Sequence, residues 1–167
     1  ETFSVLLISF GGVFGQILLP LTSKFYSSNK QAELKRIIYT GTKLNTIFIS
    51  LLMFVLIINI ESILILYLGE NNMYLSKWIV LALISQFGLH SSPLSSLIIA
   101  SGKIRPILVF SSINCIVSLI FLYKMVPTLE VGAAIISLFI YNMSQQFFSY
   151  FYYAYKYFSF NSKKLIL

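Results

Sequence analysis

The chain has 167 residues, of which 57% are hydrophobic and 10% charged, and it carries a formal net charge of +7. A soluble domain averages about 25% charged residues, and a core of this size could not bury so much apolar surface. The composition therefore excludes an ordinary soluble domain and predicts an integral membrane protein. In a membrane the basic excess is explained by attraction to anionic headgroups, so no nucleic-acid partner is expected.

Five long stretches contain no charged residue. A helix needs about 20 residues, at about 1.5 Å each, to cross the hydrocarbon of a bilayer. The sequence therefore predicts an all-α, polytopic transmembrane helix bundle. The five predicted spans are 2–23, 44–60, 78–102, 106–123 and 131–155.

The charges alternate between the gaps. Ten of the twelve Lys and Arg residues lie in gaps one and three and in the tail, where Glu33 is the only acid, whereas the N-terminus and the other two gaps have a net charge of −2. Basic residues near span ends stay on the cytoplasmic side, so we predict an outside N-terminus, a cytoplasmic C-terminus and a plasma (inner) membrane location. An outside start at Glu1 rather than Met predicts the C-terminal piece of a longer protein.

The first stretch holds Gly11 and Gly15, a spacing that lets two helices approach closely. Lys24 follows the stretch at its cytoplasmic end. The segment 27–43 is amphipathic and is predicted to lie in the headgroup plane. Its cations either anchor the topology or also attract an anionic phosphate group. Beyond the second stretch, a short apolar run ends at Gly69, as is typical of a helix end.

The third stretch is unusual because Gln86 and His90, four residues apart, are predicted to share one helix face, with Pro93 a turn further on. Pro93 removes a backbone donor, which neighbouring serine hydroxyls can partly offset. Ionisable groups inside a membrane are costly and favour a functional role. The alternative is a neutral histidine hydrogen-bonded to another helix.

The fourth and fifth stretches each carry one polar stripe along an apolar rod. These stripes either hydrogen-bond between helices or line a water-filled cavity, and stripes on three of five helices favour the cavity. The aromatic run 147–158 is predicted to anchor the bundle at the membrane interface. The stripe residues are Ser111, Asn114, Ser118, Asn142, Gln145, Gln146 and Ser149.

Features of an enzyme are missing from the sequence. It shows no nucleophile beside a base, no paired carboxylates, no phosphate-binding glycine loop and no metal-ligand spacing. Cys115 is the only cysteine, so an intramolecular disulfide is excluded. We therefore expect neither catalysis nor a cofactor or metal.

Four segments resemble polysaccharide (O-antigen type) flippases, in the same order along the chain. Leu-Pro-Leu-Thr-Ser-Lys-Phe-Tyr at 19–26, followed by Glu-Leu-Lys-Arg-Ile at 33–37, resembles the link that leads into their second half. The apolar run 63–69 closed by glycine, the turn 97–105 and the Val-Gly-Ala-Ala-Ile-Ile segment 131–136 are similar to later parts of these proteins.

This resemblance implies the multidrug/oligosaccharidyl-lipid/polysaccharide exporter fold, with two six-helix lobes around a central cavity. The chain would supply the last five helices of the second lobe, and its partners would be membrane lipids, the missing N-terminal lobe and a lipid-linked oligosaccharide. The implied activity is the flipping of a polyprenyl-pyrophosphate-linked oligosaccharide from the cytoplasmic to the outer leaflet by alternating access.

Polarity and spacing alone select the candidate substrate-binding residues. Lys24, Lys103 and Arg105 are predicted at the cytoplasmic mouth. Three alternatives stay open: a multidrug/cation antiporter of the same fold, a flippase for a lipid-linked peptidoglycan precursor, and a noncatalytic membrane subunit or fragment. The residues predicted to lie in the cavity are Gln86, His90, Asn114, Asn142 and Gln145.

Overall fold

The computed structural model describes residues 2–161, and over that range the chain is helical without strands. Glu1 and the tail lysines Lys163 and Lys164 lie outside the described residues. The α-helices are α1 (Thr2–Ser27), α2 (Gln31–Ile58), α3 (Ile60–Leu68), α4 (Ser76–Ser85), α5 (Ser92–Ser101), α6 (Arg105–Leu129), α7 (Val131–Phe147) and α8 (Ala154–Phe158). Two 3₁₀ helices, η1 (Glu70–Leu75) and η2 (Gln86–Ser91), and a π-helix, η3 (Phe148–Tyr153), complete the described part.

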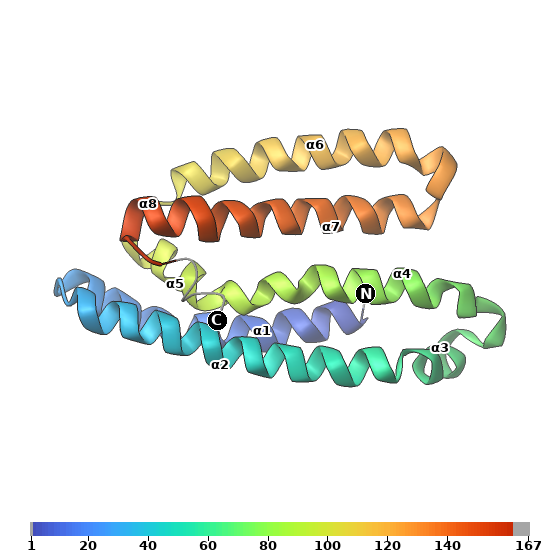
Figure 1. Ribbon diagram of the computed structural model, residues 1–167, viewed down its shortest axis with the longest axis horizontal. Coiled ribbons are helices and arrows are strands. Elements are labelled where there is room, and N and C mark those ends of the chain that lie inside the picture. The colour runs from blue at the N-terminus through green and yellow to red at the C-terminus, as the bar shows by residue number, and fades with distance from the viewer. Residues whose placement is uncertain (1, 162–167) are drawn as a thin grey trace.

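These elements form five helical rods that alternate in direction (Figure 1). The first two are α1 and α2, the third is α4–η2–α5, the fourth is α6 and the fifth is α7–η3–α8. α1 packs against α2 and α5, α7 packs against α4, and α6 packs mainly against α7. The α6–α7 hairpin therefore forms a second layer over the first three rods.

The alternation collects the turns at two ends of the bundle (Figure 1). One end holds the α1–α2 turn, the α5–α6 turn and α8, and the opposite end holds α3, η1 and the α6–α7 turn. The basic gaps and the gaps rich in glutamate thus lie at opposite ends, as the alternating charges predict. We call the end that holds the α1–α2 turn, the α5–α6 turn and α8 the basic end.

Two helices of the described residues, α2 and α6, are long and apolar enough to cross a membrane. The third and fifth predicted spans are each divided, because a 3₁₀ turn follows α4 after 10 residues and a π turn follows α7 after 17. The predicted all-helical class is confirmed, and the number of membrane crossings stays a prediction.

The amphipathic segment 27–43 does not form a separate helix in the headgroup plane, and this prediction is wrong. From Gln31 it is the first part of α2, which continues unbroken to Ile58. The apolar side chains of Leu34 and Ile38 are buried against α5 and the C-terminal residues, so tertiary packing draws the segment into the bundle. The predicted end at Gly69 is confirmed, since this glycine follows α3 with a φ of 76°.

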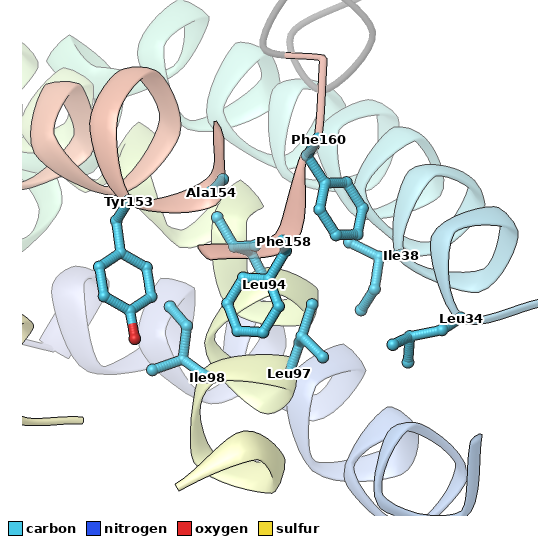
Figure 2. Close-up of a cluster of buried hydrophobic side chains, with 9 residues drawn as sticks. All are labelled: Leu34, Ile38, Leu94, Leu97, Ile98, Tyr153, Ala154, Phe158 and Phe160. Carbon is cyan, nitrogen blue, oxygen red and sulfur yellow. The ribbon is translucent and has the colours of Figure 1, made fainter. Parts of the chain in front are cut away.

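Two hydrophobic clusters hold the rods together, one at the basic end and one further along. Figure 2 shows the first cluster, in which the C-terminal aromatic side chains insert between α2 and α5. Tyr153 and Phe158 of the aromatic run are 0% and 8% exposed, and Phe160 beyond it is 1% exposed, so these three side chains are core rather than an interfacial anchor. The second cluster comprises Leu7, Ile49, Met53, Ile60, Leu64 and Leu83.

The close approach predicted from Gly11 and Gly15 is confirmed. A Cβ at Gly11 would lie 2.8 Å from the Cβ of Leu89, and a Cβ at Gly15 would lie 3.0 Å from the carbonyl oxygen of Ser92. Both positions bring α1 directly against the third rod where that rod is irregular. Small residues at such contacts are the usual means of close helix packing in membranes.

Candidate functional site: a polar cavity beside the broken third rod

The third rod changes from α to 3₁₀ geometry at η2 because Pro93 has no backbone N–H to donate to the carbonyl of Leu89. The N–H of Ser92 donates to that carbonyl instead, three residues back. The hydroxyls of Ser91 and Ser96 donate to carbonyls three residues back, each at 2.7 Å. These hydroxyls bond to the Gly88 and Pro93 carbonyls and not to the Leu89 carbonyl, so compensation by serine hydroxyls stays a prediction.

Asn45 of α2 is the central hydrogen-bonding group at this break. Its side chain is fully buried, and Nδ2 lies 3.0 Å from the Leu89 carbonyl oxygen, 3.3 Å from that of His90 and 3.0 Å from Ser92 Oγ. Ser92 Oγ in turn donates to the carbonyl of Gly11 at 2.7 Å. The network joins three rods at one point.

Sequence reasoning missed Asn45. A signal was available, because a donor from a neighbouring helix is one of the groups that can satisfy the carbonyl freed by a proline inside a span. Within the predicted span 44–60, Asn45 and Asn59 are the two asparagines, and Asn59 stands at the end. The sequence does not show which helix faces Pro93, so the pairing could not be derived.

A polar cavity of about 220 Å³ adjoins the break. A second cavity of about 200 Å³ lies between α1 and α5 and shares Ser92 and Ser95 with the first. The two cavities therefore meet along the first turn of α5. The lining of the polar cavity is Ser85, Gln86, Gly88, Leu89, Ser91, Ser92, Ser95, Asn142 and Gln146.

Gln146 of α7 closes one side of the polar cavity. Its Nε2 donates to the Gly88 carbonyl at 3.0 Å, and a Cβ at Gly88 would lie only 2.5 Å from that nitrogen. A larger residue at position 88 would therefore force the Gln146 side chain to move. The Oε1 of Gln146 is buried without a hydrogen-bond partner among the described residues.

The structure brings together two of the five predicted cavity residues, Gln86 and Asn142. His90 is not part of the lining: it is buried, its ring lies 4.8 Å from that of Phe87, and Nδ1 donates to the Phe87 carbonyl at 2.6 Å. The predicted common face of Gln86 and His90 is wrong because a 3₁₀ helix has about three residues per turn, which turns residues four apart by about 120°.

Gln145 and Asn114 also lie away from the cavity lining. Gln145 precedes the lining residue Gln146, and its Oε1 is buried with no partner in the described chain. Asn114 donates from Nδ2 to the Tyr141 carbonyl at 2.9 Å, so its predicted place in the cavity is corrected to a place in the α6–α7 contact.

Two further hydrogen bonds join α6 to α7. Ser111 Oγ lies 2.6 Å from Tyr141 Oη, and Ser137 Oγ donates to the Ser118 carbonyl at 2.6 Å. Of the two interpretations of the polar stripes, interhelical hydrogen bonding therefore holds for the side chains of Ser111 and Asn114, whereas Ser118 Oγ is buried with no partner among the described residues. The cavity interpretation holds for part of α7 and for the third rod.

The three predicted mouth residues, Lys24, Lys103 and Arg105, are exposed at the basic end. The Nζ of Lys103 lies 5.7 Å from the ring centre of Tyr157 and 5.5 Å from that of Phe158. None of the three lines the polar cavity. The structure thus separates the predicted site into an uncharged cavity and a cationic end.

The cavity lining offers hydroxyl, amide and backbone groups, which can exchange hydrogen bonds with a neutral polar ligand. Within residues 2–161, no group of three His, Cys, Asp or Glu side chains could hold a metal ion. Comparison of the chain with protein-family models, with curated proteins and with solved structures finds no match.

Proposed function

We propose that this chain is the C-terminal part of a membrane transporter that flips a polyprenyl-pyrophosphate-linked oligosaccharide from the cytoplasmic to the outer leaflet. One observation carries the proposal: an uncharged polar cavity lies beside an interrupted helix within a bundle of apolar rods. Transporters characteristically build substrate sites near the bilayer midplane from such discontinuous helices.

The proposed membrane arrangement has five crossings, one for each rod. α1, α2 and α6 have 26, 28 and 25 residues, which at about 1.5 Å each exceed the roughly 30 Å of hydrocarbon. The two divided rods cross as well, because non-helical backbone is tolerated at membrane depth where it lines a cavity. The basic end faces the cytoplasm.

The proposed roles follow the two parts of the site. The sugars exchange hydrogen bonds with Gln86, Asn142 and Gln146 in the cavity. Lys24, Lys103 and Arg105 attract the pyrophosphate at the cytoplasmic side, and the prenyl chain stays in the lipid. The cavity is smaller than the roughly 300–1,000 Å³ of typical ligand pockets, so the remainder of the longer protein completes it.

A drug or cation antiporter of the same fold is less well supported. Such an antiporter needs a buried acid that exchanges a proton or metal ion for its cationic substrate. The residues that line the two adjoining cavities include no Asp or Glu. Their neutral donors and acceptors suit sugar hydroxyls better than a cation.

Transport can be tested with the full-length protein in vesicles that contain a fluorescent polyprenyl-pyrophosphate oligosaccharide. We expect the double variant Gln86→Ala/Asn142→Ala to lower the rate of flipping about tenfold or more, since each lost contact is worth about 1 kcal/mol. Ser111→Ala is a matched control, because this polar residue lies on the α6–α7 contact. No flipping by the unaltered protein, or equal rates for both variants, would contradict the proposal.

Topology needs a separate test by cysteine labelling in a Cys115→Ala background. We expect an impermeant maleimide to label Asn72→Cys, in η1, from outside the cell and Ser28→Cys, in the α1–α2 turn, only after the membrane is opened. Both positions lie in turns or short segments at opposite ends of the bundle (Figure 1). The reverse pattern would overturn the proposed orientation.

A further inference from the structure

A shallow groove lies on the surface between α6 and α7. It has a volume of about 520 Å³ and is lined by Phe110, Met143, Ser144, Phe147 and Phe148. The rings of Phe110 and Phe148 are stacked with their centres 4.1 Å apart and their planes 5° from parallel. The side chain of Phe147 is 64% exposed. The groove is thus mainly apolar, and a stacked aromatic pair forms part of its lining.

This groove is distinct from the polar cavity. Met143 and Phe147 line the groove, whereas Asn142 and Gln146, the residues just before them, line the cavity. Successive residues of an α-helix point about 100° apart, so α7 presents different sides to the two features. A ligand in the groove is therefore separate from a ligand in the cavity.

The groove leads toward the basic end along one edge of the fifth rod. Phe148, Tyr152 and Lys156 follow at intervals of four residues, and the rings of the first two lie 5.3 Å apart. The Nζ of Lys156 donates to Tyr152 Oη at 2.7 Å. This hydrogen bond raises the pKa of Lys156 above its ordinary value.

A second cation meets Lys156 at Tyr157. The Nζ of Lys156 lies 5.9 Å from the centre of the Tyr157 ring, and that of Lys103 lies 5.7 Å from the same point. We call Lys103 and Lys156 the Tyr157 cation pair. Glu33 is the one acidic residue that the described chain contributes to this end, so the positive charge is largely uncompensated.

We propose that the groove and the Tyr157 cation pair form a binding site for an anionic phospholipid. An acyl chain lies along Phe110, Phe147 and Phe148, and the phosphate lies at the cation pair. The apolar length of the groove and the cations beyond one end of it match the two parts of such a lipid. The proposal depends on the membrane placement of α6 and α7, and it shares Lys103 with the proposed transport function.

The exposed surface of α6 supports a lipid occupant. Leu108, Val109 and Ile113 are 58%, 61% and 57% exposed, and α6 is one of the two helices that meet the length and hydropathy requirements for crossing a membrane. Side chains beside the groove therefore face hydrocarbon in the proposed arrangement. Two cations near the headgroups then favour an anionic over a zwitterionic lipid.

Quenching by brominated lipids tests the site. Phe147→Trp in the full-length protein places a fluorophore in the groove, and the signal of the parent protein, which contains Trp78, is subtracted. In mixed bilayers we expect brominated phosphatidylglycerol to be preferred over brominated phosphatidylcholine about fivefold at the introduced tryptophan. In the variant Lys103→Gln/Lys156→Gln, the ratio of quenching by brominated phosphatidylglycerol to quenching by brominated phosphatidylcholine should fall to about one.

The matched control is Lys77→Gln/Lys124→Gln, which removes the same charge from two exposed lysines near the opposite end. This control should keep the preference. Equal quenching by the two lipids, or an equal loss of preference in both double variants, would refute a specific site. Native mass spectrometry of the otherwise unaltered protein and both lysine double variants gives a second measurement, with retained phosphatidylglycerol expected to decrease only for Lys103→Gln/Lys156→Gln.

Failure of this proposal is distinguishable from failure of the proposed function. If flipping is observed without lipid preference, the groove is ordinary lipid-facing surface and the transport proposal stands. If lipid preference is observed without flipping, the site stands on its own.

Discussion

The contact between Asn45 and the break at Pro93 allows a quantitative prediction about stability. Asn45 donates to oxygen atoms of η2 and α5 that lie beside the position where Pro93 lacks a donor. If Asn45 compensates for that missing donor, then Pro93→Ala, which restores a backbone N–H, should make Asn45 less important. The two substitutions should therefore be coupled.

The magnitude follows from the geometry. The amide nitrogen has two hydrogens, and its two shortest contacts, to Leu89 and Ser92, are both 3.0 Å. Interhelical hydrogen bonds in membranes contribute about 0.6 kcal/mol each, and truncation of a fully buried side chain adds to the loss. We expect Asn45→Ala to lower the free energy of unfolding by about 1–3 kcal/mol.

In a Pro93→Ala background the same substitution should cost about 1 kcal/mol less, because the new N–H donates to the carbonyl of Leu89. Unfolding of the full-length protein by sodium dodecyl sulfate in mixed micelles provides the four free energies of the cycle. Single effects of Pro93→Ala on packing cancel in the coupling energy.

Asn59→Ala is the control. Asn59 directly follows the last residue of α2, away from the break, and its exposed side chain donates locally to the Val55 carbonyl at 2.8 Å. Its replacement should cost about 0.5 kcal/mol or less. An Asn45→Ala effect of equal size with and without Pro93 would refute the compensation argument.

Three further predictions concern packing, the α6–α7 contact and the cation pair. Gly11→Ala should destabilise the protein by about 1–3 kcal/mol, because the new Cβ would meet the Cβ of Leu89 in η2 at 2.8 Å. Gly12→Ala is the control and should be neutral or slightly stabilising, since a Cβ there meets nothing within 4 Å. Equal melting temperatures of the two variants would contradict the prediction. Ser137→Ala, which removes a 2.6 Å bond to a carbonyl of α6, should cost about 0.6 kcal/mol in detergent unfolding, and a neutral effect would mean that this bond contributes nothing. Tyr152→Phe should lower the pKa of Lys156, because the hydroxyl that accepts the hydrogen bond from Lys156 Nζ is lost. An NMR titration of labelled lysine that shows no decrease in this pKa would exclude a contribution of the Tyr152 hydroxyl.

The secondary structure was largely predictable because it follows from local patterns. Apolar stretches free of charge marked the five rods, and Gly69 marked a helix end through its lack of a Cβ. The irregular third rod was also foreseeable from Pro93. The division of the fifth rod by a π turn was not, since the segment 148–153 contains neither glycine nor proline.

The candidate site was only partly predictable. Gln86 and Asn142 line the polar cavity, but His90 lies away from it in the 3₁₀ turn and Asn114 bonds to Tyr141. A polar residue on an apolar helix must find a partner, and the sequence shows this need without showing the partner. Whether a stripe faces a cavity or a neighbouring helix depends on rotations that local patterns do not specify.

The sequence by itself determined the helical class, the succession of the rods and the separation of basic from acidic turns, because hydrophobicity and charge act residue by residue along the chain. Only the tertiary structure decided that segment 31–43 joins the bundle, that Asn45 serves the break at Pro93, and that three of the C-terminal aromatic side chains form core. These outcomes depend on which surfaces meet, and contact between distant segments is set by the fit of all five rods together.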